Sequence, residues 1–125
     1  MAVSTIKQSM AINDQNIKLS TSTPIVITPT TGCSAYAPWG GCYYYKIGTR
    51  VAVHIGVSGL TANTYVSNIG VLLPAGFRPR WETHVFGSSG TSVGYSRVTI
   101  FPGGTIGIVS TGVYGLIDVS YDAFG

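Results

Sequence analysis

The segment Arg80-Trp81-Glu82-Thr83-His84 is the densest group of polar and aromatic side chains in the sequence. An indole ring can stack on the apolar face of a sugar, while guanidinium, carboxylate and imidazole groups can bond its hydroxyls. On a strand Trp81 would face away from Arg80, Glu82 and His84, unless the segment is looped. The segment is therefore a candidate ligand site, and packing of Trp81 in a core or subunit interface is the competing interpretation.

Two further aromatic residues are candidates for ligand contact. Trp39 stands beside a pair of glycines, and Tyr95 follows a segment rich in glycine and serine at 88–92. Loops of this composition can carry recognition, although they can equally be plain connections between strands. The candidate ligand-binding residues are thus Trp39, Arg80, Trp81, Glu82, His84 and Tyr95.

Catalytic chemistry finds little support in the sequence. The carboxylates are Asp14, Glu82, Asp118 and Asp122, and only Glu82 with Asp118 forms a pair within one domain that could serve a glycosidase. A catalytic triad would need a nucleophile elbow that leads into a helix, and no helix follows such a segment here. We expect no catalytic residue and no cofactor.

The two cysteines, Cys33 and Cys42, are separated by eight residues in a loop without nearby histidines. Free thiols are favoured over a short-loop disulfide because no secretory signal is visible, and two cysteines do not complete a zinc site. His54 alternates with apolar neighbours. An ordinary hydrogen-bonded histidine is favoured there over an ion site on a symmetry axis, and we expect no metal.

Charged residues form 9% of the 125-residue chain and hydrophobic residues 45%, against about 25% charged in ordinary soluble domains. One compact domain of this size would leave excess apolar surface, which predicts a homo-oligomer. The seven basic residues are scattered, so no nucleic-acid footprint forms. Proline and asparagine interrupt every long uncharged stretch, so no membrane insertion is expected.

Glycine, proline and β-branched residues dominate, and hardly any run of strong helix formers occurs. The alternation predicts strands at 16–20, 24–28, 43–47, 50–57, 65–73, 84–87, 92–101, 105–110 and 114–121. Val3, Ile6 and Met10 could form a short N-terminal helix, either as a neck or as a frayed tail. Prolines and glycines predict a corner at 74–79 and a hairpin turn at 102–104. The fold class is therefore all-β, an antiparallel sandwich or barrel.

Several segments in the same order resemble the C-terminal head domain of bacteriophage tail-fibre and receptor-binding proteins. They are Tyr45-Lys46-Ile47-Gly48, Val57-Ser58-Gly59-Leu60-Thr61, Leu73-Pro74-Ala75-Gly76-Phe77-Arg78-Pro79, the hairpin from Val98 to Ile108, and Leu116-Ile117-Asp118-Val119-Ser120-Tyr121. We therefore expect residues 42–125 to form a β head domain, and residues 1–41 to form a neck or extended segment with short strands.

The resemblance implies a homotrimer at the tip of the virion tail, assembled in the host cytoplasm and held by other phage tail proteins. It implies non-catalytic, multivalent binding of a bacterial surface glycan, and it carries over no ligand motif. The alternatives are a purely structural virion component, such as a baseplate or decoration protein, and a small cellular lectin or hydrolase.

Overall fold

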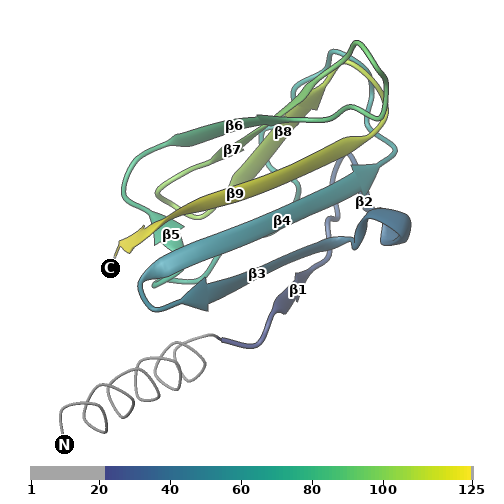
Figure 1. Cartoon of the computed structure of the whole chain (residues 1–125). Helices are drawn as coiled ribbons and strands as arrows, with labels where there is room; N and C mark the ends of the chain where they lie inside the picture. The colour runs from purple at the N-terminus through teal and green to yellow at the C-terminus, as the bar shows by residue number, and fades with distance from the viewer. Residues whose placement is uncertain (1–21, 125) are drawn as a thin grey trace, which may run out of the picture.

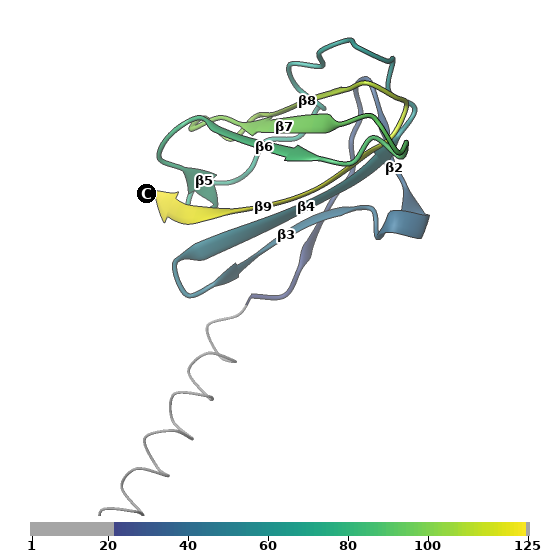
Figure 2. The same cartoon turned by 45° about the horizontal axis from the view of Figure 1, so that its top comes forward.

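The computed structural model describes residues 22–124, which form two antiparallel sheets packed face to face (Figures 1 and 2). The larger sheet has the order β1-β3-β4-β9-β5, with β2 paired to β4, and the smaller has the order β6-β7-β8. The strands are β1 (Ile25–Ile27), β2 (Ser34–Ala35), β3 (Cys42–Ile47), β4 (Arg50–Ser58), β5 (Arg78–Pro79), β6 (Thr83–Gly87), β7 (Ser96–Ile100), β8 (Ile106–Ser110) and β9 (Gly115–Phe124). The antiparallel all-β sandwich expected from the sequence is confirmed.

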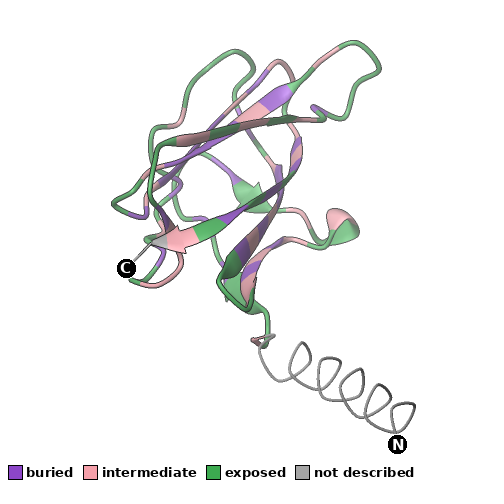
Figure 3. Cartoon of the chain, turned by 60° about the vertical axis from the view of Figure 1, so that its left-hand side comes forward, coloured by how far each residue is buried: buried purple, intermediate pink, exposed green. Residues whose placement is uncertain are grey.

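Strand β4 lies at the centre of the larger sheet, between β3 and β9. Its residues Val51, Val53, Ile55 and Val57 are all at most 1% exposed, while the residues between them face away from the core. The alternation of buried and exposed residues along the strands is visible in Figure 3. A side-chain period of two thus places one apolar face of β4 in the interior, as the sequence predicts.

The smaller sheet supplies the opposite half of the core. Val98 and Ile100 of β7 and Ile106 and Ile108 of β8 are fully buried. The two sheets also meet at one side, where the backbones of Ser88 and Leu116 exchange two hydrogen bonds of 3.0 Å. This bridge between the end of β6 and β9 closes the sandwich into a partial barrel along that side.

Some predicted elements differ from those observed. The segment 65–73 is not a continuous strand: it meets β8 and the β7–β8 turn through isolated bridges at Val66 and Leu72. The backbone N–H of Gly70 donates to the side chain of Asn68, and Gly70 has a positive φ. Both features interrupt the pairing of this segment with its neighbours. The predicted strand at 92–101 begins only with β7, after the loop that ends at Tyr95.

The segment before β3 contributes β1 and β2, which pair with β3 and β4 in the same sheet, and a 3-10 turn η1 (Ala37–Trp39) that sequence reasoning missed. The predicted N-terminal helix and the predicted strand at 16–20 lie outside the described residues. Within residues 22–124, no helix has the length and apolar character that a bilayer crossing requires.

The predicted hairpin turn joins β7 to β8 through Pro102, Gly103 and Gly104. Gly104 has a φ of 92°, and a Cβ there would lie 2.5 Å from the Leu73 carbonyl oxygen. Gly103 has no positive φ, and a Cβ there would meet nothing within 4 Å. The backbone therefore requires glycine at position 104, whereas position 103 has room for a side chain.

We expect Gly104→Ala to destabilise the protein by about 1–3 kcal/mol, because it adds both backbone strain and a steric clash. Gly103→Ala should change the free energy of unfolding by less than about 0.5 kcal/mol. Urea unfolding of both variants measures this difference. Equal losses would contradict the assignment of the strained position to Gly104.

Candidate functional site

The corner after Leu73 positions the segment that carries Trp81. Phe77 N donates to the Pro74 carbonyl at 3.1 Å, and Arg78 Nε donates to the Leu73 carbonyl at 2.7 Å. Gly76 supports the turn with a φ of 90°, which glycine adopts without steric cost. These local bonds turn the chain so that Pro79 can pair with β9 at the end of the larger sheet.

A hydrogen bond from β9 fixes this corner to the core. Tyr121 Oη donates to the Phe77 carbonyl at 2.5 Å, and burial raises the pKa of this phenol, so it stays protonated and donates. The Phe77 ring packs edge-on against Tyr44, with ring centroids 5.0 Å apart. These contacts therefore fix the position, relative to β9, of the segment that carries Trp81.

A surface cavity of about 370 Å³ lies where this corner meets the end of β9. Its lining residues are Pro79, Arg80, Trp81, Thr83, Tyr121, Asp122 and Ala123. The Trp81 side chain is 73% exposed, and the Arg80 guanidinium carbon lies 5.6 Å from the centre of its ring. An open indole face beside a cationic group, a hydroxyl and a carboxylate has the chemistry that a saccharide requires.

The sequence predicted part of this site. The chain bends at Arg80 and Trp81 instead of continuing as a strand, so both side chains reach the cavity. Tyr121 and Asp122 were missed, because they stand about 40 positions further along the chain and no local motif marks them. Only the register of β5 against β9 brings these two segments together.

The predicted candidates Glu82 and His84 do not line the cavity. Glu82 Oε1 lies 3.2 Å from His84 Nε2, and His84 Nδ1 lies 3.0 Å from the Thr99 hydroxyl on β7. Tyr95 contacts the ring of Phe86, with ring centroids 5.7 Å apart. These residues belong to the outer face of the smaller sheet, so the six predicted residues do not form one site.

Trp39, the remaining candidate, lies in η1 within an aromatic cluster. Its ring centroid is 5.2 Å from that of Tyr36 and 5.4 Å from that of Tyr114. A Cβ on Gly90 would lie 3.2 Å from the Trp39 ring, so the 88–94 loop also packs on it. Trp39 is half-buried and joins loops by packing, which favours a structural role over an open stacking platform.

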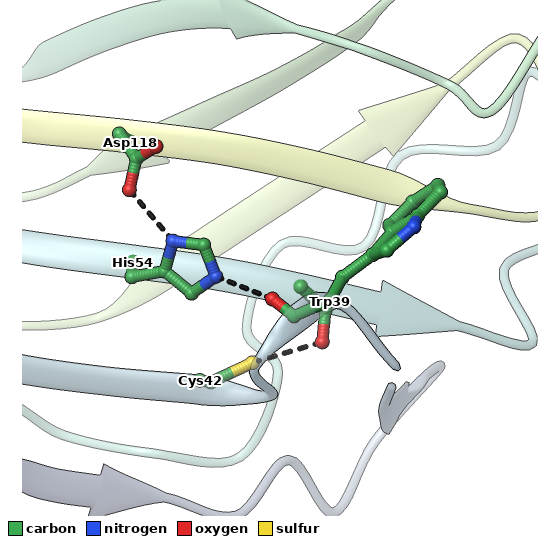
Figure 4. A network of polar contacts seen from close by, with 5 residues as sticks. Trp39, Cys42, His54 and Asp118 are labelled. Atoms are coloured by element: carbon green, nitrogen blue, oxygen red, sulfur yellow. Dashed lines mark hydrogen bonds and ion pairs between the residues drawn. The ribbon is translucent and has the colours of Figure 1, made fainter. Parts of the chain in front are cut away.

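His54 connects this cluster to β9 (Figure 4). Its Nδ1 lies 2.6 Å from Asp118 Oδ1, and its Nε2 lies 2.7 Å from the Trp39 carbonyl oxygen. A carboxylate and a carbonyl both accept, so both contacts are hydrogen bonds when each ring nitrogen carries a proton. In a hydrolytic triad Nε2 would face a nucleophile, whereas here it faces a backbone carbonyl.

The two cysteines are buried free thiols. Burial raises the pKa of Cys33 to about 11, with a smaller contribution from nearby Cys42, and burial also raises the pKa of Cys42. Cys42 Sγ lies 3.6 Å from the Gly56 carbonyl oxygen, which a protonated thiol can approach as a donor. No group of three or more potential metal ligands occurs among the described histidine, cysteine and acidic residues.

The two histidines offer a matched comparison, because the side chain of His54 is 15% exposed and that of His84 is 44% exposed. We expect His54→Ala to lower the free energy of unfolding by about 1–3 kcal/mol, since the Trp39 carbonyl loses its side-chain partner. His84→Ala should cost less than about 1 kcal/mol. Urea unfolding measures both values, and a loss in His84→Ala as large as in His54→Ala would contradict this role of His54.

Comparison of the chain with family models, with curated proteins and with solved structures gives no match.

Proposed function

We propose that the chain is a non-catalytic adhesion module of a bacteriophage virion, which binds a saccharide on the bacterial surface. The observation that carries this proposal is the exposed Trp81 ring beside a cavity of about 370 Å³. An exposed indole ring beside a cavity offers an apolar surface to a ligand, and sugars present apolar faces that match such a ring.

The polar groups of the cavity support a saccharide as ligand. Thr83, Arg80 and Asp122 supply a hydroxyl, a guanidinium and a carboxylate at its wall. Asp122 Oδ1 is held 3.4 Å from Arg50 Nη1, and Thr83 Oγ1 donates to the Trp81 carbonyl at 2.9 Å. Donors and acceptors held by the fold can bond hydroxyl groups at a low cost in conformational entropy.

The module acts as a homotrimer at the tail tip, assembled in the host cytoplasm and attached to other tail proteins. The scarcity of charge supports self-association, with 9% charged and 45% hydrophobic residues. Three equivalent weak sites on one particle would strengthen attachment, since the second contact becomes effectively intramolecular.

Trp81→Ala should lower binding to a glycan array of bacterial surface saccharides, and to cells, by about tenfold or more. Loss of a central aromatic contact typically costs more than about 1.4 kcal/mol. Val26→Ala is the matched control, because Val26 is 76% exposed on β1, at the opposite edge of the sheet. Trp81→Phe should retain part of the binding.

Equal binding by Trp81→Ala and the wild-type protein would place recognition outside the cavity. Retention by phage particles without any binding to cells would favour the alternative of a structural virion component. Turnover of a bacterial wall polysaccharide would favour a hydrolase.

The oligomeric state is tested separately. Light scattering at low concentration should give a mass near three times the 13.1 kDa of one chain. A clean monomer would contradict the excess of apolar surface expected from composition, and it would remove the contribution of avidity. An oligomer with a different number of chains would contradict the proposed trimer but would agree with the prediction of self-association.

A further inference from the structure

The outer face of the smaller sheet presents a cluster of rings around one arginine. Val98 and Ile108 of β7 and β8 face the core, so the neighbouring residues on these strands face outward. In the register of the sheet, Phe86 lies opposite Arg97 and Arg97 lies opposite Val109. Arg97 therefore occupies the middle strand of the solvent-facing side.

The Arg97 side chain is held in place by its neighbours. Its guanidinium carbon lies 6.0 Å from the centre of the Tyr65 ring, and its Nε is buried without a hydrogen-bond partner. The Tyr65 ring in turn lies over Gly107, where a Cβ would be 2.5 Å from Tyr65 Oη. Among the polar side-chain atoms of the described residues, Nε of Arg97 is the one that is buried and unpaired.

No carboxylate among the described residues forms an ion pair with Arg97. Each described carboxylate is already paired with another side chain: Glu82 with His84 at 3.2 Å, Asp118 with His54 at 2.6 Å and Asp122 with Arg50 at 3.4 Å. A guanidinium with its stem fixed and no carboxylate partner is suited to bind a planar oxyanion from outside. The same pairing disfavours Glu82, Asp118 and Asp122 of a second copy as the source of that anion.

Exposed aromatic rings border this arginine. Phe86 is 66% exposed and Tyr95 is 52% exposed, and their rings meet edge to face with centroids 5.7 Å apart. Apolar faces next to a cation match a sugar ring that carries an acidic group. None of these residues lines the Trp81 cavity.

We propose that Tyr65, Phe86, Tyr95 and Arg97 form a second binding site, for an acidic saccharide whose carboxylate pairs with Arg97. The choice of a saccharide rests on the proposed function, whereas the position of the site and the negative charge of its ligand do not. Carbon-bound hydrogens of the sugar pack on Phe86 and Tyr95, and the carboxylate approaches the terminal nitrogens of Arg97.

The test uses titration calorimetry on the full chain with three probes: a uronic-acid oligosaccharide, a neutral oligosaccharide of the same length and poly(glycerol phosphate). Arg97→Gln should weaken binding of the uronic-acid probe by at least about tenfold, and higher salt should weaken binding of this probe to the wild type. Lys46→Gln is the matched control, because it removes the same unit of charge from β3 of the larger sheet, outside both proposed sites. It should change the affinity by less than about twofold.

Tyr95→Ala provides a second variant at an exposed position, in case Arg97→Gln fails to fold. It should also weaken binding of the uronic-acid probe. No binding of that probe by the folded wild type at millimolar concentration would overturn the proposal, as would equal losses in Arg97→Gln and Lys46→Gln. Tighter binding of poly(glycerol phosphate) would overturn the assignment of a carboxylate.

Trp81→Ala separates this site from the cavity. If the uronic-acid probe loses affinity in Trp81→Ala and keeps it in Arg97→Gln, the acid binds in the cavity and the second site is wrong, while the proposed function stands. If Arg97→Gln instead changes the mass measured by light scattering, the face is an interface between copies, and the proposal is overturned.

Discussion

The structure depends on the burial of one face of β4. The four aliphatic residues that point inward from this strand are almost completely excluded from water, and burial of such side chains contributes about 1.5–3 kcal/mol each. Because β4 pairs with β3 along one edge and β9 along the other, its register fixes both neighbours. A slip by one residue would turn the apolar face to solvent, so the packing specifies a single arrangement.

That register also determines what the outer face of the larger sheet can do. His54 lies opposite Tyr43 on one side and Asp118 on the other. The ring of Tyr43 stacks on His54 with centroids 4.9 Å apart, and the carboxylate of Asp118 accepts a hydrogen bond from His54 Nδ1 when that nitrogen carries the hydrogen. Gly56, the next outward position on β4, leaves room for the backbone of η1, since a Cβ there would lie 3.0 Å from the Trp39 carbonyl oxygen. The 3-10 turn thus rests on β4 at Gly56, an outward position without a side chain.

Charge is so sparse that the few charged groups define distinct regions of the surface. The three described carboxylates each pair with a basic side chain, and the Lys46 ammonium lies 4.9 Å from the centre of the Phe77 ring. Arg97 instead faces an aromatic ring, and its Nε has no acceptor. Electrostatic recognition of a ligand would therefore concentrate at a small number of positions, with aromatic rings supplying most of the remaining contact surface.

The sequence by itself determined the fold class, the alternation in β4 and β9, the hairpin at Pro102 and the corner before Pro79, because these depend on side-chain period and on local turn chemistry. It also marked Arg80 and Trp81 as residues that could contact a ligand. Only the tertiary structure decided which distant residues join them. Asp122 reaches the cavity through the pairing of β5 with β9, and Tyr65 reaches Arg97 because an irregular segment crosses Gly107. Such contacts depend on strand register and on the path of loops, which are set by long-range packing and leave no local pattern in the chain.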